Sequence, residues 1–224
     1  MEQIKILYED KHIVICVKPQ NILSQQDGKG SPDMVKTLGE MTGADVKVVH
    51  RLDFGVGGVM VYAKSDIAAS RLSECVRNKS FEKEYYAVVM GRPAEDAGVY
   101  KDLLFKDSSK NKTYVVDRMR KGVKEASLEY KVIDTKETEK GDMSLVWIKL
   151  HTGRTHQIRV QFASRRTPLY GDGKYGSKTS DKKTALWSYR LTFPHPVTKK
   201  MISFSDIPDD SFPWNVFDFS DNRS

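Results

Sequence analysis

Short β-strand patterns recur along this chain of 224 residues and constrain its fold more than any other feature. Runs rich in β-branched and aromatic residues, bounded by turn residues, are typical of strands. Seven such runs stand in the sequence: IKILYED, HIVICVKP, GVMVYAK, KEYYAVVMG, TYVVD, ASLEYKVID and SLVWIKL. Because few helical patterns separate them, the sequence predicts an α+β fold with a central mixed, mainly antiparallel sheet flanked by a few helices and loops.

Three segments have helical patterns. Ser31-Pro32 gives an N-cap residue followed by proline, which predicts a short helix near residues 32–40. Ser65-Asp66 predicts a second helix that ends at Asn78. The segment THQIRVQFASRR fits a strand or a helix, and Thr155 as an N-cap favours the helix.

The chain shows no internal repeat and no low-complexity linker. The simplest prediction is a single domain over residues 1–224, with the C-terminal tail 209–224 packed on it or mobile. Residues 106–112 (KDSSKNK) and 174–183 (KYGSKTSDKK) are expected to form mobile loops.

Composition describes a soluble protein without export or membrane signals. Hydrophobic residues make up 39% and charged residues 30% of the chain. No apolar run approaches the roughly 20 residues needed to span a bilayer, and the N-terminus lacks the pattern of a secretory signal. With only Cys16 and Cys75, a disulfide framework is not expected. We therefore expect a cytoplasmic protein, with a monomer as the default oligomeric state.

Positive charge is concentrated in two segments. The net charge is +7, yet residues 149–183 alone hold nine Lys or Arg against two Asp, and residues 101–124 hold eight against three. Concentrated cations indicate a polyanionic partner, with nucleic acid first. The alternative is a solvated surface that keeps the protein soluble.

Several well-known motifs do not fit. GDGKYGSK at 171–178 lacks the glycine spacing of a phosphate-binding NTPase loop. His151 and His156 stand five residues apart with no cysteine pair nearby, so the sequence predicts no metal site. Both cysteines lie in apolar patterns, which disfavours a cysteine nucleophile.

The stretch VVHRLDFGVGGVMVYAKS, residues 48–65, places Asp53 between a cationic pair and a glycine-rich bend. An aspartate before such a bend is most often a turn residue. However, Arg51 would share a face with Asp53 if the strand continued, and Gly55, Gly57 and Gly58 would leave the backbone bare for a ligand. An arginine beside a carboxylate favours its charged form, which could act as a nucleophile or a base.

Two further clusters carry polar residues. TGRTHQIR, residues 152–159, crowds Arg154, His156 and Arg159 together, as an anion-binding turn or a basic surface turn would. In FEKEYYAVVMG, residues 81–91, Tyr85 and Tyr86 should face opposite sides of a strand. One tyrosine could then enter a cleft while the other packs, although two packed tyrosines are the commoner case.

These clusters, in this order, resemble the RluA-type pseudouridine synthases. HRLD with its glycine-rich strand, KEYYAVVMG, and TGRTHQIRVQFASRRTPLYGDGKYG match the motifs of that family, and LTFPHP at 191–196 with FSDIP at 204–208 resembles its closing segment. The resemblance runs from about residue 8 to 208. It implies a pseudouridine synthase fold and isomerisation of uridine in structured ribosomal or transfer RNA, without a cofactor or metal.

The resemblance also implies roles for individual residues. Asp53 falls on the essential aspartate, Tyr85 on the tyrosine that stacks under the uracil, and Arg159 on the arginine that pairs with the aspartate, with Arg154 as the alternative. Substrate contacts would come from the two motifs around them: His50, Arg51, Leu52, Arg154, Thr155, His156 and Gln157.

The sequence departs from the family pattern in two places. Val56-Gly57 stands where a Thr-Ser pair is commoner, so two hydroxyl groups are missing. The catalytic pattern begins near residue 6, so no separate N-terminal RNA-binding domain is expected. The competing hypothesis is a non-catalytic RNA-binding or RNA-folding protein on the same scaffold, which would need neither Asp53 nor Tyr85.

Overall fold

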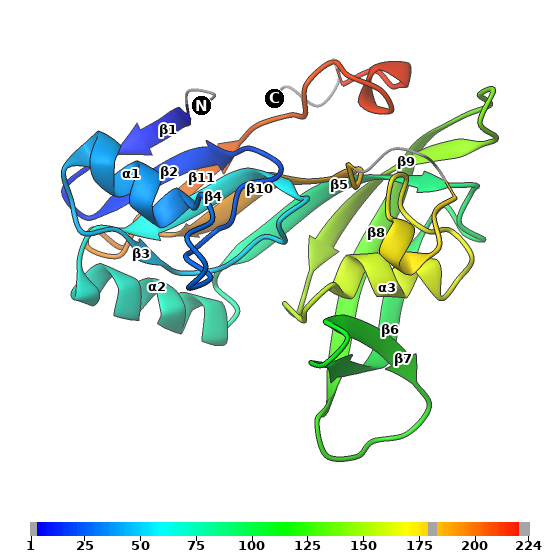
Figure 1. The fold of residues 1–224 in the computed structure, drawn as a ribbon, viewed down its shortest axis with the longest axis horizontal. Helices are drawn as coiled ribbons and strands as arrows, with labels where there is room; N and C mark the ends of the chain where they lie inside the picture. The colour runs from blue at the N-terminus through cyan, green and yellow to red at the C-terminus, as the bar shows by residue number, and fades with distance from the viewer. Residues whose placement is uncertain (1–3, 179–182, 220–224) are drawn as a thin grey trace. The chain divides into compact units, whose positions relative to one another are not determined.

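A computed structural model describes residues 4–178 and 183–219 (Figure 1). The chain divides into two compact units, Met1–Lys83 with Trp187–Pro208 and Glu84–Leu186 with Asp209–Ser224. Each unit is described by itself. The expectation of a single domain over residues 1–224 stays a prediction.

The first unit is built on a sheet with one parallel pair of strands. Its strands are β1 (Lys5–Glu9), β2 (Ile13–Lys18), β3 (Lys47–Val48), β4 (Gly57–Ala63), β10 (Leu186–Pro194) and β11 (Met201–Ser205). β1 and β2, β2 and β4, β3 and β4, and β10 and β11 pair antiparallel. β4 and β10 run parallel, with Gly57 opposite Trp187 and Gly58 opposite Ser188.

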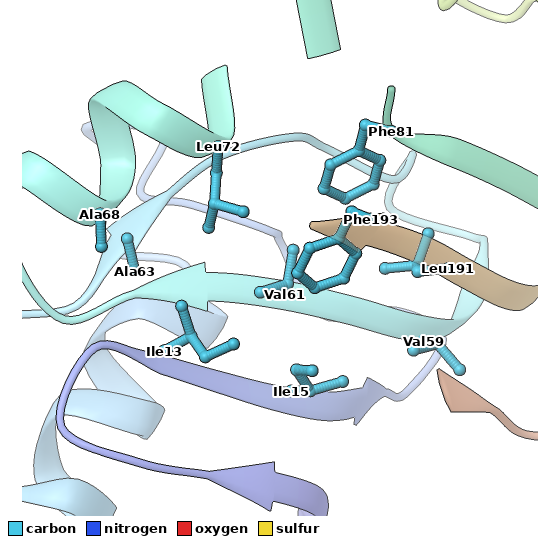
Figure 2. Packing of buried hydrophobic residues seen from close by; sticks show 10 residues of the cluster. All are labelled: Ile13, Ile15, Val59, Val61, Ala63, Ala68, Leu72, Phe81, Leu191 and Phe193. Carbon is cyan, nitrogen blue, oxygen red and sulfur yellow. The ribbon is translucent and has the colours of Figure 1, made fainter. Parts of the chain in front are cut away.

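Both faces of the central strands in this unit are covered, because every residue of β2 and β4 is buried. On one face, Ile13, Ile15, Val59, Val61 and Ala63 pack under helix α2 (Asp66–Arg77) with the rings of Phe81 and Phe193 (Figure 2). The two rings are stacked, 4.7 Å between centroids. Strands buried on both sides read as continuous apolar runs, as HIVICV and VMVYA do.

The two helices of the first unit were predicted, one of them with the wrong cap. α2 begins after Ser65, whose side chain accepts the Ala68 N–H, and it is followed by Asn78, as expected. α1 (Met34–Thr42) begins two residues later than predicted, because Asp33 rather than Ser31 caps it by accepting the Lys36 N–H. An aspartate is as good an N-cap as a serine, and here it stands directly before the first helical residue.

The second unit holds an antiparallel sheet in the order β5-β9-β8-β6-β7. The strands are β5 (Glu82–Met90), β6 (Ala97–Asp107), β7 (Lys112–Val116), β8 (Val123–Lys136) and β9 (Met143–Leu150). Helix α3 (Gln157–Ala163) packs on β6 and β7 (Figure 1). Val160 of α3 forms a small apolar cluster with Leu104, Ala126 and Tyr175.

The two segments predicted to be mobile loops, and the C-terminal tail, contain local structure where the structure describes them. Residues 106–112 include a compact hairpin turn between β6 and β7, in which the Asp107 carboxylate accepts N–H groups from Ser109 and Lys110. In the segment 174–183, residues 179–182 lie outside the described part of the chain, and Gly173–Tyr175 forms a 3₁₀ turn. In the tail, Trp214 and Phe217 are buried, and the Phe219 ring meets Tyr86 edge to face.

The fold class predicted from the sequence is confirmed. The described residues form a mixed, mainly antiparallel set of strands with three α-helices, which is an α+β fold. None of the helices in residues 4–178 and 183–219 is long and apolar enough to cross a membrane.

Candidate active site

Asp53 lies in a turn, not in a strand. β3 ends at Val48, so the strand periodicity that would have put Arg51 and Asp53 on one face does not hold. The Val56 N–H donates to the Asp53 carbonyl oxygen over 3.0 Å and closes a four-residue turn. The Asp53 side chain is half-buried, while β4 begins immediately after the turn at Gly57. The motif therefore joins a carboxylate to the end of a fully buried strand.

A segment about thirty residues earlier holds this turn in place. Ser24 Oγ accepts the Leu52 N–H at 3.0 Å and donates to the Leu52 carbonyl oxygen at 2.9 Å. The Asn21 N–H donates to the Phe54 carbonyl oxygen at 2.8 Å, and Gln20 Nε2 to that of Gly55 at 2.9 Å. We call these bonds from residues 20–24 the clamp. They fix the backbone on both sides of Asp53.

Gly57 and Gly58 serve strand packing, which corrects the expectation that they leave room for a ligand. A Cβ at Gly57 would overlap the Trp187 ring, and one at Gly58 would overlap the Ser188 backbone. Gly58 also has a φ of 115°, which L side chains rarely adopt. The glycines of this motif are thus explained by the parallel approach of β10. At the departure from the family pattern, Val56 is buried and Gly57 lies against Trp187.

A fully buried lysine stands near Asp53, and the sequence analysis missed it. Lys18 ends β2 and has no exposed surface; its Nζ donates to the carbonyl oxygens of Pro19 and Ile22, each over 2.8 Å. Burial lowers the pKa of Lys18 to about 8, and the negative charge of Asp53 acts in the opposite direction. At neutral pH the Lys18 ammonium is therefore mostly charged, and it attracts the Asp53 carboxylate. A lysine closing the otherwise apolar run HIVICVKP was the available signal.

His50 and Leu52 are buried inside the first unit, and their expected role as substrate contacts stays a prediction. His50 Nε2 accepts the Val61 N–H over 3.3 Å, and its ring packs on Phe81. Burial, and secondarily the cation of Lys83, lower the pKa of His50 to about 3. A neutral, buried imidazole cannot hold a phosphate by charge. Leu52 is only 8% exposed, so both residues anchor the loop.

Arg51 and Phe54 are the residues that this loop presents to solvent. Arg51 is exposed and forms no ion pair with the residues that the structure describes. The Phe54 side chain follows Asp53 directly and is 52% exposed, although its backbone is fixed by the clamp. An exposed aromatic ring on a fixed backbone is a surface on which a planar group can stack.

The second unit contains Tyr85 and Arg159. Tyr85 and Tyr86 are adjacent in β5, opposite Ile148 and Trp147 of β9, and both are buried. Since successive residues of a strand face opposite sides, Tyr85 faces away from the side on which Tyr86 meets Phe219. That Tyr85 and Asp53 act in one active site stays a prediction.

Arg159 is held by a buried carboxylate. Its Nε and one Nη donate to the two oxygens of Asp172 at 2.7 and 2.8 Å, and its guanidinium lies 5.2 Å from the centre of the Tyr175 ring. Asp172 is 1% exposed. Such a bidentate pair fixes the plane of the guanidinium. Asp172 lies in the family motif that ends GDGKYG, but no role was predicted for it from the sequence. The pairing of Arg159 with Asp53 stays a prediction.

The turn of residues 152–155 depends on Gln157. Gln157 Oε1 accepts from Thr152 Oγ1 at 2.7 Å and from the Arg154 N–H at 3.0 Å, while its Nε2 donates to the Ser127 carbonyl oxygen. Gln157 is 3% exposed, so it supports the turn from within. Arg154 Nε donates to the Glu125 carbonyl oxygen at 2.9 Å.

The expected N-cap of α3 was wrong, although the helix was predicted. The cap position belongs to His156, with a φ of 53° and no side-chain cap bond. The buried His156 Nδ1 lies 2.9 Å from Tyr175 Oη, so the imidazole packs inside the second unit. Its expected role as a substrate contact stays a prediction. Thr155 is half-buried, and its carbonyl oxygen accepts from Thr113 Oγ1.

No group of three or more His, Cys, Asp or Glu side chains in the described ranges is arranged to hold a metal ion. The first unit offers one half-buried carboxylate near a buried ammonium, and the second unit offers a buried tyrosine and a fixed guanidinium. An ionised carboxylate of this kind can attack an electrophilic carbon.

Known proteins with this pattern are similar along most of the chain. A protein described as an uncharacterized RNA pseudouridine synthase of Aquifex aeolicus is 34% identical over 93% of this chain and 71% of its own length. Ribosomal large subunit pseudouridine synthase D of Zymomonas mobilis is 30% identical over 92% of this chain and 70% of its own. Ribosomal large subunit pseudouridine synthase C of Rickettsia typhi is 30% identical, but the match covers only 56% of that protein.

The fold is shared with a solved structure. Human RNA pseudouridylate synthase domain containing 1 matches with a TM-score of 0.78 and 21% identity, over 93% of this chain and 84% of that one. The sequence model of the family described as RNA pseudouridylate synthase matches residues 12–164, which include the Asp53 loop, the β5 tyrosines and all of α3. The chain therefore belongs to the RNA pseudouridylate synthase family.

Proposed function

We propose that this protein converts specific uridines of structured RNA to pseudouridine, with Asp53 as the nucleophile. The observation that carries the proposal is the clamped turn, which fixes the backbone at Leu52, Phe54 and Gly55 and holds the carboxylate near the Lys18 ammonium. A nucleophile on a rigid support reacts with less loss of freedom than one on a mobile loop.

The reaction is an isomerisation and needs no net co-reactant. Asp53 attacks the ribose C1′ or the uracil ring as the bond between C1′ and N1 breaks. The freed uracil turns, C5 forms the new bond to C1′, and the bond made by Asp53 breaks so that the carboxylate is released. N1 takes up a proton while the proton on C5 is lost. Tyr85 stacks under the base and accepts the C5 proton in this scheme, and Arg159 orients Asp53.

The RNA strand must present an unstacked base. A uridine within folded RNA has to flip out at a cost of a few kcal/mol, which phosphate and stacking contacts offset. Arg51, Phe54, Arg154 and Thr155 are the proposed contacts, and Phe54→Ala should weaken RNA binding where Phe54→Trp does not. The buried residues His50, Leu52, His156 and Gln157 position them.

Ribosomal RNA is the proposed substrate, because relatives from Zymomonas and Rickettsia carry names as synthases of the large ribosomal subunit. We further place the protein in the cytoplasm, as a monomer. Mapping pseudouridines in ribosomal and transfer RNA from cells with and without the gene tests the substrate. A lost pseudouridine in transfer RNA alone would overturn the ribosomal choice.

The catalytic proposal is tested with Asp53→Asn, which keeps the size of the side chain and removes its charge. We expect RNA binding close to that of the wild type and no pseudouridine formation in single-turnover assays. Asp45→Asn, at a carboxylate with an 82% exposed side chain, is the matched control and should stay fully active. Conversion at the wild-type rate by soluble Asp53→Asn protein would exclude Asp53 as the nucleophile, whereas RNA binding without any conversion by the wild type would favour the non-catalytic, RNA-binding alternative.

A further inference from the structure

A basic cavity of about 160 Å³ lies in the second unit, on the face of β6, β7 and β8 that α3 partly covers. The sheet register explains why its residues meet. Leu104 stands opposite Lys124, and Lys106 opposite Thr113, so these alternate residues point to one face. The turn before α3 adds Arg154 and Thr155 as the remaining wall.

Three cations line this cavity and no carboxylate does. Lys106, Lys124 and Arg154 form no ion pair with any residue in the described parts of the chain. Like charges gathered around one hollow repel one another, and this repulsion is relieved when an anion binds between them. The arrangement therefore favours an anionic ligand over an empty cavity.

The cavity is also preorganised. The Arg154 N–H donates to Gln157 and its Nε to the Glu125 carbonyl oxygen, so the backbone and the base of the guanidinium are fixed. Neither Nη group is bonded to a residue within 4–178 or 183–219. Thr113 Oγ1 donates to the Thr155 carbonyl oxygen at 2.9 Å and joins β7 to the turn. A guanidinium fork with two flexible ammonium groups matches the oxygens of a phosphate.

We propose that this cavity binds one phosphodiester group of the RNA substrate. The inference deepens the proposed function and rests on it for the identity of the ligand. Among its lining residues there is no aromatic ring on which a base could stack. The cavity would therefore hold the backbone irrespective of sequence and set the register of the strand, while the base is recognised elsewhere.

The test is the salt dependence of RNA binding. Lys106→Gln, Lys124→Gln and the double variant are compared with Lys131→Gln, which removes a lysine from the opposite face of β8. Binding of a fluorescein-labelled hairpin from large-subunit ribosomal RNA is followed by fluorescence anisotropy at salt concentrations from about 50 to about 200 mM. Over this range the loss of affinity with salt reports the number of phosphate contacts. Urea unfolding verifies that each variant is folded.

We expect each single variant to bind about threefold more weakly at 100 mM salt, and the slope of log K against log salt to fall by about one in the double variant. Lys131→Gln should keep the wild-type slope. Equal slopes in the double variant and Lys131→Gln would overturn the proposal. A second outcome would also overturn it: the wild type binds inorganic phosphate tightly, and the double variant loses that binding but keeps the wild-type salt slope for RNA. The cavity would then be a site for a free anion.

This readout separates the two proposals. If the wild type binds RNA with the expected slopes but forms no pseudouridine, the proposed catalysis fails and the phosphate site stands. If it forms pseudouridine and the slopes do not differ, the site fails and the catalysis stands.

Discussion

The loop that presents Asp53 is held by a segment about thirty residues earlier, whereas the turn that presents Arg154 is held both from within its own motif and by remote strands. Ser24, Asn21 and Gln20 hold the first. Gln157, three residues after Arg154, holds the second together with the carbonyl oxygens of Ser127 and Glu125. The first loop should therefore respond to substitutions far from it in the sequence, and the second should respond to its near neighbours as well.

The largest effect on the second unit should come from Asp172→Ala. The change leaves the Arg159 guanidinium, with a side chain only 11% exposed, without its bidentate partner. Removing one member of a buried ion pair costs about 3–5 kcal/mol of the free energy of unfolding. Urea unfolding measures it, with Asp96→Ala as the control, since the Arg92–Asp96 pair is exposed and should contribute under about 1 kcal/mol. If both variants lost a similar amount of unfolding free energy, burial of the Arg159–Asp172 pair would contribute nothing to stability.

The next effect concerns the remote support of the first unit. In Gly58→Ala the new Cβ overlaps the Ser188 backbone and the residue is forced to a φ of 115°. Overpacking and backbone strain together should lower the free energy of unfolding by about 3 kcal/mol. Gly43→Ala is the matched control: its φ is also positive, at 65°, but nothing lies within 4 Å of the new Cβ. It should cost about 1 kcal/mol. If Gly58→Ala and Gly43→Ala lowered the free energy of unfolding equally, β10 would have to shift away from the new Cβ at no cost.

The difference between the two regions also explains what the sequence could predict. Strand runs, the α2 cap at Ser65 and the three motifs were readable because each depends on residues near one another. Asp33 as the cap of α1 is also a local feature, but the predicted cap was Ser31. In contrast, Ser24 as the support of Leu52, and Trp187 as the reason for Gly57, depend on residues that only the fold brings together. Strand periodicity failed at Arg51 and Asp53 because β3 ends at Val48.

Acid should loosen the first unit through His50. Its pKa is about 3 in the folded state and about 6.5 when unfolded, so between these values the unfolded chain binds more protons and stability falls as the pH falls. From pH 7 to pH 5 the contribution is about 2 kcal/mol of the free energy of unfolding. His50→Gln keeps an acceptor for the Val61 N–H and does not titrate. Its unfolding free energy should therefore fall by about 2 kcal/mol less over the same interval, and an identical pH dependence would exclude His50 as the cause.

The smallest expected change in stability is also the most direct test of remote support. Ser24→Ala removes the hydroxyl that satisfies both the N–H and the carbonyl oxygen of Leu52, which should cost about 1–2 kcal/mol. Ser31→Ala, at a partly exposed serine bonded to Asp27, should cost almost nothing. Because the released loop carries Asp53, Ser24→Ala should lower kcat for pseudouridine formation more than it raises KM.

Thr152→Ala is the counterpart in the second unit, since Thr152 Oγ1 donates to Gln157 and accepts the Ser127 N–H. That variant should weaken RNA binding through Arg154 and leave kcat for bound RNA less affected than Ser24→Ala does. If both variants change kcat and KM in the same proportion, the two regions act as one structural element, and the contrast between local and remote support has no functional counterpart. Opposite proportions would assign the chemistry to the clamped loop and the grip on the RNA backbone to the Arg154 turn.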